Sequence, residues 1–310
     1  MPVSGFGPII SATDRCELCP RRCGADRRAG EKGFCGAGVE MEIYSYGRHC
    51  GEEPPVSGTR GSGTVFFSRC TLRCLYCQNH PWSQEARGDR YDAAGLAAVF
   101  RSLADEGCHN WNLVSPTPWI PGIVQALEMV QKKGRRLPVV YNTSGYERAE
   151  TIRELSGVAQ VYLADLRYSR PESALEGSGA ADYVKAARKA FLEMWSQAGA
   201  LRVDSEGIAQ SGVICRLLVL PGRAVEACEN LEWLKANAGA GVCISLMSQY
   251  IPAHLAGGRP GWDRGISRAE YDMVLQAAMD MGFENGHVQD FGGRAARDLV
   301  GFNMKQGRKT

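Results

Sequence analysis

Three cysteines lie within eight residues of this chain, and they constrain it more than any other feature. Cys70, Cys74 and Cys77 follow the spacing C-x3-C-x2-C. A structural metal ion such as zinc is normally closed by four protein ligands. A cubane iron–sulfur cluster held by these three thiolates would instead keep one iron open to another molecule. His80 lies near enough in sequence to offer a fourth ligand, so a zinc site is the alternative.

Length, charge and hydropathy narrow the class of protein. The 310 residues are enough for one large α/β domain with an appendage, and the formal net charge of +2 predicts no strongly charged partner such as nucleic acid. No run of about 18 apolar residues exists, so no membrane span is expected. The N-terminus lacks the features of a signal peptide, which indicates a cytoplasmic location. In that reducing compartment the 12 cysteines are expected to be metal ligands or free thiols rather than disulfides.

From residue 63 onward, short apolar runs alternate with amphipathic stretches. The runs predict strands at Thr64–Ser68, Trp111–Ser115, Pro138–Asn142, Gln160–Ala164, Gly212–Leu220 and Gly241–Leu246. The stretches predict helices at Ala93–Glu106, Gly122–Lys133, Glu147–Leu155, Ala181–Gly199, Ala224–Asn237 and Arg268–Met281. This alternation predicts βαβ units and a parallel sheet, either an open doubly wound sheet or a partial (β/α)6 TIM-type barrel.

The motifs favour the partial barrel, because such barrels place their chemistry at the carboxyl ends of the strands. The three-cysteine run directly follows the first predicted strand, at such a position. We therefore divide the chain into a Cys-rich, metal-binding segment at residues 1–62 and a partial-barrel domain at residues 63–310.

The stretch Phe66-Phe67-Ser-Arg-Cys70-Thr-Leu-Arg-Cys74-Leu-Tyr76-Cys77-Gln78-Asn79 resembles the cluster loop of the radical S-adenosylmethionine (SAM) superfamily. Within that superfamily the chain is most similar to the pyruvate formate-lyase activating-enzyme branch, from roughly Gly61 onward. The resemblance implies an oxidoreductase with a [4Fe–4S] cluster on Cys70, Cys74 and Cys77 and with SAM on the open iron. Reductive cleavage of SAM would yield a 5′-deoxyadenosyl radical that abstracts a hydrogen atom, and this chemistry belongs to the cofactor.

The same resemblance suggests a protein or peptide substrate, such as a glycine of a glycyl-radical enzyme. It also suggests an electron donor such as flavodoxin or ferredoxin. Two alternatives remain open at this point. One is a radical SAM enzyme that acts on a small molecule or on a different peptide, and the other is a non-catalytic zinc-binding interaction protein.

By resemblance, the SAM contacts are polar residues at the ends of the strands. They are Tyr76 (near the adenine), Ser115, Thr117, Asn142, Ser144, Asp165, Arg167 and Arg216. Ser115 and Thr117 stand where the superfamily often has a Gly-Gly-Glu turn. Asn142 replaces an aspartate linked to a monovalent cation, so no such cation is expected. Arg167 replaces a lysine, which is not a neutral exchange in a hydrogen-bonded site. No catalytic acid, base or hydrogen donor is predicted.

A second cysteine group precedes the barrel domain. Cys16, Cys19, Cys23 and Cys35 have the spacing C-x2-C-x3-C-x11-C, in a segment with little helical or strand periodicity. Four thiolates form a complete ligand set for either zinc or a second [4Fe–4S] cluster, and the spacing does not choose between them. The arrangement resembles the N-terminal part of an uncharacterised group of activating-enzyme-like radical SAM proteins.

Overall fold

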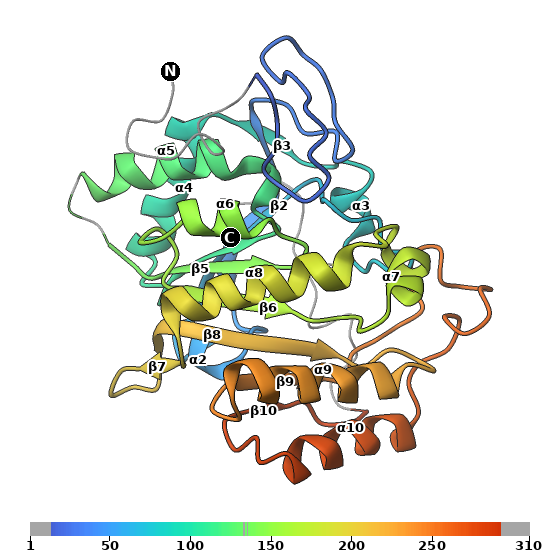
Figure 1. Ribbon diagram of the computed structural model, residues 1–310. Coiled ribbons are helices and arrows are strands. Elements are labelled where there is room, and N and C mark those ends of the chain that lie inside the picture. The colour runs from blue at the N-terminus through green and yellow to red at the C-terminus, as the bar shows by residue number, and fades with distance from the viewer. Residues whose placement is uncertain (1–13, 133, 135, 293–310) are drawn as a thin grey trace.

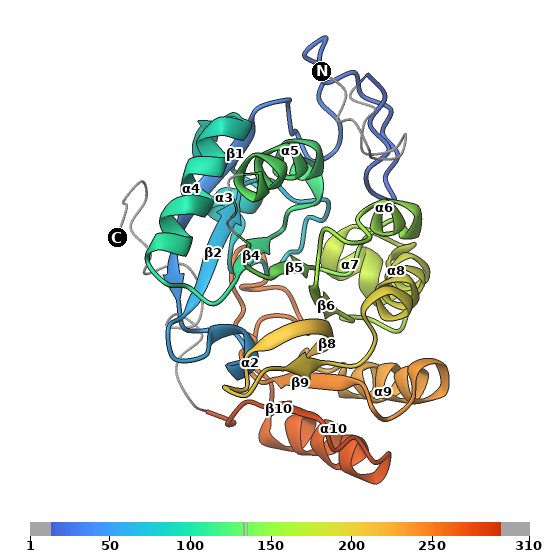
Figure 2. The ribbon, with the colours of Figure 1, turned by 90° about the vertical axis from the view of Figure 1, so that its left-hand side faces the viewer.

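One open, curved sheet organises the chain, with helices along its outer face (Figure 1, Figure 2). The computed structural model describes residues 14–132, 134 and 136–292. The outer ends of the two predicted segments, residues 1–13 and 293–310, therefore lie outside the described residues. So does Lys133, the predicted last residue of one helix.

Within the described residues the sheet contains ten strands, and its main path runs in the order β10-β9-β8-β6-β5-β4-β2-β1-β3. Their bounds are β1 Met41–His49, β2 Ser62–Phe67, β3 Asp89–Tyr91, β4 Trp111–Val114, β5 Val139–Thr143, β6 Val161–Asp165, β7 Arg202–Val203, β8 Ala209–Leu218, β9 Cys243–Met247 and β10 Gly286–Val288. All neighbours from β2 to β10 are parallel, whereas β1 pairs antiparallel with β2 and β3, and β7 pairs antiparallel with β8. Because β3 and β10 lie at opposite ends of this order, the barrel does not close.

Helices lie in the connections between the strands. They are α2 Pro54–Ser57, α3 His80–Ser83, α4 Ala93–Asp105, η1 Thr117–Trp119, α5 Ile120–Gln131, α6 Ala149–Glu154, α7 Pro171–Ser178, α8 Tyr183–Ala198, α9 Ala224–Ala238 and α10 Arg268–Asp280. Each of the parallel strands β2, β4, β5, β6, β8 and β9 is followed by one longer helix, respectively α4, α5, α6, α8, α9 and α10. These are six strand–helix units, and the predicted partial (β/α)6 organisation is confirmed.

Local sequence explains why these units form. Every residue of β2 is buried, as is typical of a parallel strand that is covered on both faces. Helix α4 begins at Asp92, whose carboxylate accepts a hydrogen bond of 2.7 Å from the Gly95 amide, and it buries Leu96, Phe100 and Leu103 on one face. Burial of these apolar faces between sheet and helices holds the carboxyl ends of the strands in place.

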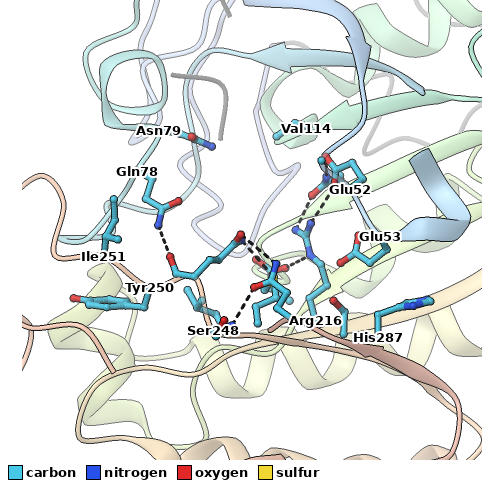
Figure 3. A pocket seen from close by; sticks show the side chains of 18 of the residues that line it. Glu52, Glu53, Gln78, Asn79, Val114, Arg216, Ser248, Tyr250, Ile251 and His287 are labelled. Carbon is cyan, nitrogen blue, oxygen red and sulfur yellow. Dashed lines mark hydrogen bonds and ion pairs between the residues drawn. The ribbon is translucent and has the colours of Figure 1, made fainter. Parts of the chain in front are cut away.

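Strand β1 was not among the predicted strands. It lies within the predicted N-terminal segment, yet it extends the same sheet through its antiparallel pairing with β2. Because β1 runs antiparallel to β2, with His49 opposite Ser62, the loop after it, residues 50–53, starts at the amino ends of the parallel strands. From there Glu52 and Glu53 line the cavity inside the barrel (Figure 3).

Candidate functional site

A cavity of about 820 Å³ opens at the carboxyl ends of the parallel strands. Its walls come from the cysteine loop after β2, the loop after β1, the ends of β5, β6, β8 and β9, and the segment that begins at β10. Figure 3 shows Gln78, Asn79 and Tyr250 on one side of this cavity and Glu52 and His287 on the other. Its position agrees with the general rule for ligand sites in α/β barrels.

The cysteine loop forms one wall, to which Cys74 and Cys77 contribute directly. The Cys74 Sγ lies 3.0 Å from the Ser178 hydroxyl, and the Cys77 Sγ lies 3.2 Å from the Ser83 hydroxyl. Burial, reinforced by the adjacent Cys74, raises the pKa of Cys70 to about 12 and that of Cys77 to about 11. These two sulfurs are therefore neutral thiols in the protein alone, and a bound metal centre would be needed to deprotonate them.

The sulfur atoms of Cys70, Cys74 and Cys77 are the type of ligand that iron–sulfur clusters require. Among the described residues, no three or more His, Cys, Asp or Glu side chains are already arranged around a metal position. Ligation by Cys74 and Cys77 would therefore replace their contacts with the serine hydroxyls. One feature beyond the ligands also suits a cluster, because the Arg167 Nη1 donates to the Cys74 Sγ at 3.2 Å. Hydrogen bonds to ligating sulfur tune such centres.

Asp165 is the centre of a charged network at the ends of β6 and β8. Its Oδ1 accepts a hydrogen bond of 2.7 Å from the Arg216 Nε, and its Oδ2 accepts one of 2.6 Å from the Arg167 Nη2. Burial raises the pKa of Asp165, but the two guanidiniums outweigh burial and hold it below its ordinary value. Arg216 also donates to the Asn142 Oδ1 at 2.7 Å. Arg167 thus links the strand-end network to the cysteine loop.

Glu52 completes this network, and it was not among the predicted site residues. Its Oε1 accepts a hydrogen bond of 2.9 Å from Asn112, and its Oε2 lies 3.7 Å from the Arg216 Nη1. Burial and the neighbouring Glu53 raise the pKa of Glu52 to about 7, against the attraction of Arg216. The signal in the sequence was the acidic pair before Pro54, but only the path of β1 brings this pair from the amino ends of the parallel strands into the cavity.

Tyr76 belongs to an aromatic wall of the cavity. Its ring is stacked on Trp262, with centroids 5.4 Å apart and planes 10° apart, and it also contacts Tyr250. Its hydroxyl lies 2.7 Å from the Tyr168 hydroxyl. The structure therefore holds this ring rigidly beside the cysteine loop.

Five of the eight predicted SAM contacts line the cavity: Tyr76, Asn142, Asp165, Arg167 and Arg216. Ser115, Thr117 and Ser144 are not among the lining residues. The Ser115 amide donates to the Asn142 carbonyl at 3.0 Å, and the Thr117 hydroxyl donates to Glu147 at 2.6 Å. The Ser144 carbonyl accepts from the Tyr183 hydroxyl at 2.8 Å.

The second cysteine group surrounds a small cavity of its own. Cys16, Cys19, Cys23 and Cys35 all line it, and the Arg27 Nη2 donates to the Cys16 Sγ at 3.0 Å. Burial raises the pKa of Cys19 to about 12. All four cysteines therefore line one cavity, but among the described residues their sulfurs are not already arranged around a metal position.

The N-terminal segment is packed directly against the first cysteine loop. Arg21 donates to the Thr71 carbonyl at 3.3 Å, and Arg73 donates to the Phe34 carbonyl at 3.3 Å. The guanidiniums of Arg21 and Arg73 both lie over the Phe34 ring. The two cysteine groups are thus joined by contacts between their loops.

The comparisons with known proteins give limited similarity. No protein-family model matches the sequence. Uncharacterized protein MJ0674 of Methanocaldococcus jannaschii is 28% identical over 274 residues, which cover 85% of this chain and 74% of that protein.

Solved structures with a similar arrangement include native anSMEcpe with bound AdoMet, with 12% identity, a TM-score of 0.48, and coverage of 71% of this chain and 61% of that one. They also include Streptococcus suis SuiB bound to precursor peptide SuiA, with 11% identity, a TM-score of 0.48, and coverage of 72% and 47%. The matches thus span about half to three fifths of the solved chains. At TM-scores below 0.5 these similarities do not define the family of this chain.

No helix within the described part of the chain has the length and apolar character needed to cross a bilayer.

Proposed function

We propose that this protein is a radical SAM enzyme that holds a [4Fe–4S] cluster on Cys70, Cys74 and Cys77 and binds SAM in the adjacent cavity. One observation supports this most directly. The Arg167 guanidinium contacts both the Asp165 carboxylate and the Cys74 sulfur, so the cysteine loop and the strand-end polar residues belong to one site. The resemblance of residues 66–79 to the cluster loop of that superfamily supplies the chemical class.

In this proposal the chain's residues bind and orient the ligands. The guanidiniums of Arg167 and Arg216 supply donors for a carboxylate, and Asn142 and Asp165 supply polar atoms for hydroxyl groups. The aromatic wall at Tyr76 offers a flat surface for the adenine. When bound, the cluster and SAM supply a 5′-deoxyadenosyl radical for hydrogen abstraction.

We also propose a protein or peptide substrate, with a glycine hydrogen as one candidate, and a flavodoxin- or ferredoxin-type electron donor. The volume of about 820 Å³ is near the upper end of the roughly 300–1,000 Å³ found for ligand sites. That volume leaves room for a substrate side chain beside SAM.

For the N-terminal cysteines we propose a bound metal, either zinc or a second cluster. The common cavity of Cys16, Cys19, Cys23 and Cys35 supports a shared ligand. The contacts from Arg21 and Arg73 would couple that metal to the position of the first cysteine loop.

The test is anaerobic reconstitution, followed by iron, sulfide and zinc analysis and by an assay for 5′-deoxyadenosine with SAM and dithionite. We expect about four iron and four sulfide per chain at the first site, a brown chromophore, and deoxyadenosine formation. Zinc without an iron–sulfur chromophore would instead support a zinc-binding interaction protein. A glycyl-radical signal in electron paramagnetic resonance, recorded with a candidate partner enzyme, would test the glycine substrate.

A further inference from the structure

Glu53 has a buried carboxylate oxygen without a partner. The residue is only 9% exposed, it lines the main cavity, and its Oε2 makes no hydrogen bond. Glu53 precedes α2, but its side chain does not cap that helix, whose first amides bond to the Glu53 carbonyl instead. A buried acceptor left in this state costs free energy, so a local structural role does not explain the side chain.

The cations that surround Glu53 are already engaged. The Arg216 Nε and Nη2 donate to Asp165 and Asn142, and its Nη1 is nearest to Glu52. Arg167 is bound to Asp165 and to the Cys74 sulfur. Two guanidiniums therefore face three acidic side chains, Asp165, Glu52 and Glu53, and no hydrogen bond from either guanidinium reaches the Glu53 Oε2.

Two other residues of the cavity wall have buried polar atoms without partners, namely the Asn79 Oδ1 and the His287 Nε2. Figure 3 shows Glu53 and His287 together on the side of the cavity opposite to Asn79. Burial lowers the pKa of His287, which keeps its imidazole neutral near pH 7. The unsatisfied oxygens are acceptors, so a complementary ligand must bring hydrogen-bond donors, and a donor that carries a positive charge binds a carboxylate most strongly.

We propose that Glu53, with His287 beside it, binds a cationic hydrogen-bond donor of the substrate, namely the guanidinium or ammonium group of an arginine or lysine side chain. The inference rests on the proposed function and deepens it by naming the chemical class of the peptide substrate. The opposite wall then belongs to the cysteine loop and to SAM, and the charged end of the substrate side chain lies against Glu53. The ammonium group of SAM is the other cation available to Glu53, and the experiment separates the two.

The test is calorimetric titration of the reconstituted, SAM-loaded protein with N-acetyl-arginine amide, N-acetyl-lysine amide and the neutral isostere N-acetyl-citrulline amide. We expect the arginine probe to bind about 10-fold more tightly than citrulline, because one charge-assisted hydrogen bond distinguishes them. Glu53→Gln should abolish this preference. The matched control Glu206→Gln, at a surface ion pair with Arg60, should retain it.

Equal affinity of the wild-type protein for the arginine and citrulline probes would overturn the inference without any variant. A Glu53→Gln variant that weakens SAM binding about 10-fold but keeps the arginine preference would also overturn it, and would assign Glu53 to SAM. Because the Glu53 Oε2 has no protein partner, this variant should melt at or above the wild-type temperature. If the protein prefers the arginine probe over citrulline but never cleaves SAM, this inference is supported and the proposed enzyme is refuted. If the protein cleaves SAM but binds both probes equally, only this inference is refuted.

Discussion

Replacing Asp165 by alanine should destabilise the protein strongly. Its side chain is 5% exposed and holds the side chains of Arg167 and Arg216, which are 20% and 13% exposed. Removing the carboxylate leaves two guanidiniums in a buried site with one counter-charge fewer. Removing one partner of a buried ion pair typically costs about 3–5 kcal/mol, because the remaining charge stays desolvated. The free energy of unfolding should fall by this amount.

Urea unfolding at pH 7, followed by circular dichroism, measures this loss on the metal-free protein. The control is Glu206→Ala, which removes an exposed pair with Arg60 whose side chains are 53% and 63% exposed. That change should cost only about 0–1 kcal/mol. If Asp165→Ala costs no more than this control, the network is not the buried, tightly coupled unit described here, and Arg167 is not fixed by Asp165.

Three further predictions concern the cysteines and a buried acid. Cys74→Ala should remove the iron–sulfur chromophore and deoxyadenosine formation while the N-terminal metal stays bound, and wild-type SAM cleavage would show that Cys74 is not a ligand. Cys19→Ala should lower the melting temperature of the reconstituted protein, because a bound structural metal contributes folding free energy; lost chemistry at unchanged stability would instead favour an electron-relay cluster. Burial raises the pKa of Glu147 to about 7, despite hydrogen bonds from Thr117 and Thr143. Glu147 binds its proton more tightly in the folded protein than in the unfolded chain, where its pKa is near 4.5. The free energy of unfolding therefore falls as the pH rises from about 4.5 toward 7. Glu147→Gln should therefore stabilise the protein by about 2 kcal/mol more at pH 8 than at pH 5, as measured by urea unfolding, and an effect independent of pH would contradict this reasoning.

Much of the barrel could be predicted because its signals are local. The apolar runs that became β2, β4, β5, β6, β8 and β9 are nearly continuous, as buried parallel strands require. Among the described strands, β1, β3, β7 and β10 escaped prediction. The last three have only 3, 2 and 3 residues, and β1 mixes polar and charged residues with apolar ones, so none of the four forms a continuous apolar run.

The candidate site also contains residues whose location could be predicted from the sequence and others whose location could not. Asn142, Asp165 and Arg216, which the sequence places toward the ends of strands, line one cavity, since the carboxyl ends of parallel strands share one edge. Thr117 is different, because its backbone turns into η1 and its hydroxyl meets Glu147 rather than the cavity. The direction of a side chain in a turn depends on backbone angles that residue type alone does not set.

The amino-acid sequence by itself determined the order of strands and helices and the cysteine loop after the first parallel strand. Hydrophobic periodicity and cysteine spacing are patterns of a few neighbouring residues, so they can be read without the tertiary structure. Only the three-dimensional structure decided that Glu52 and Glu53 face the same cavity as Cys74. That meeting depends on the antiparallel pairing of β1 with β2, which directs the loop after β1 into the interior of the barrel. Burial there raises the pKa of Glu52 and leaves one carboxylate oxygen of Glu53 without a hydrogen-bond partner.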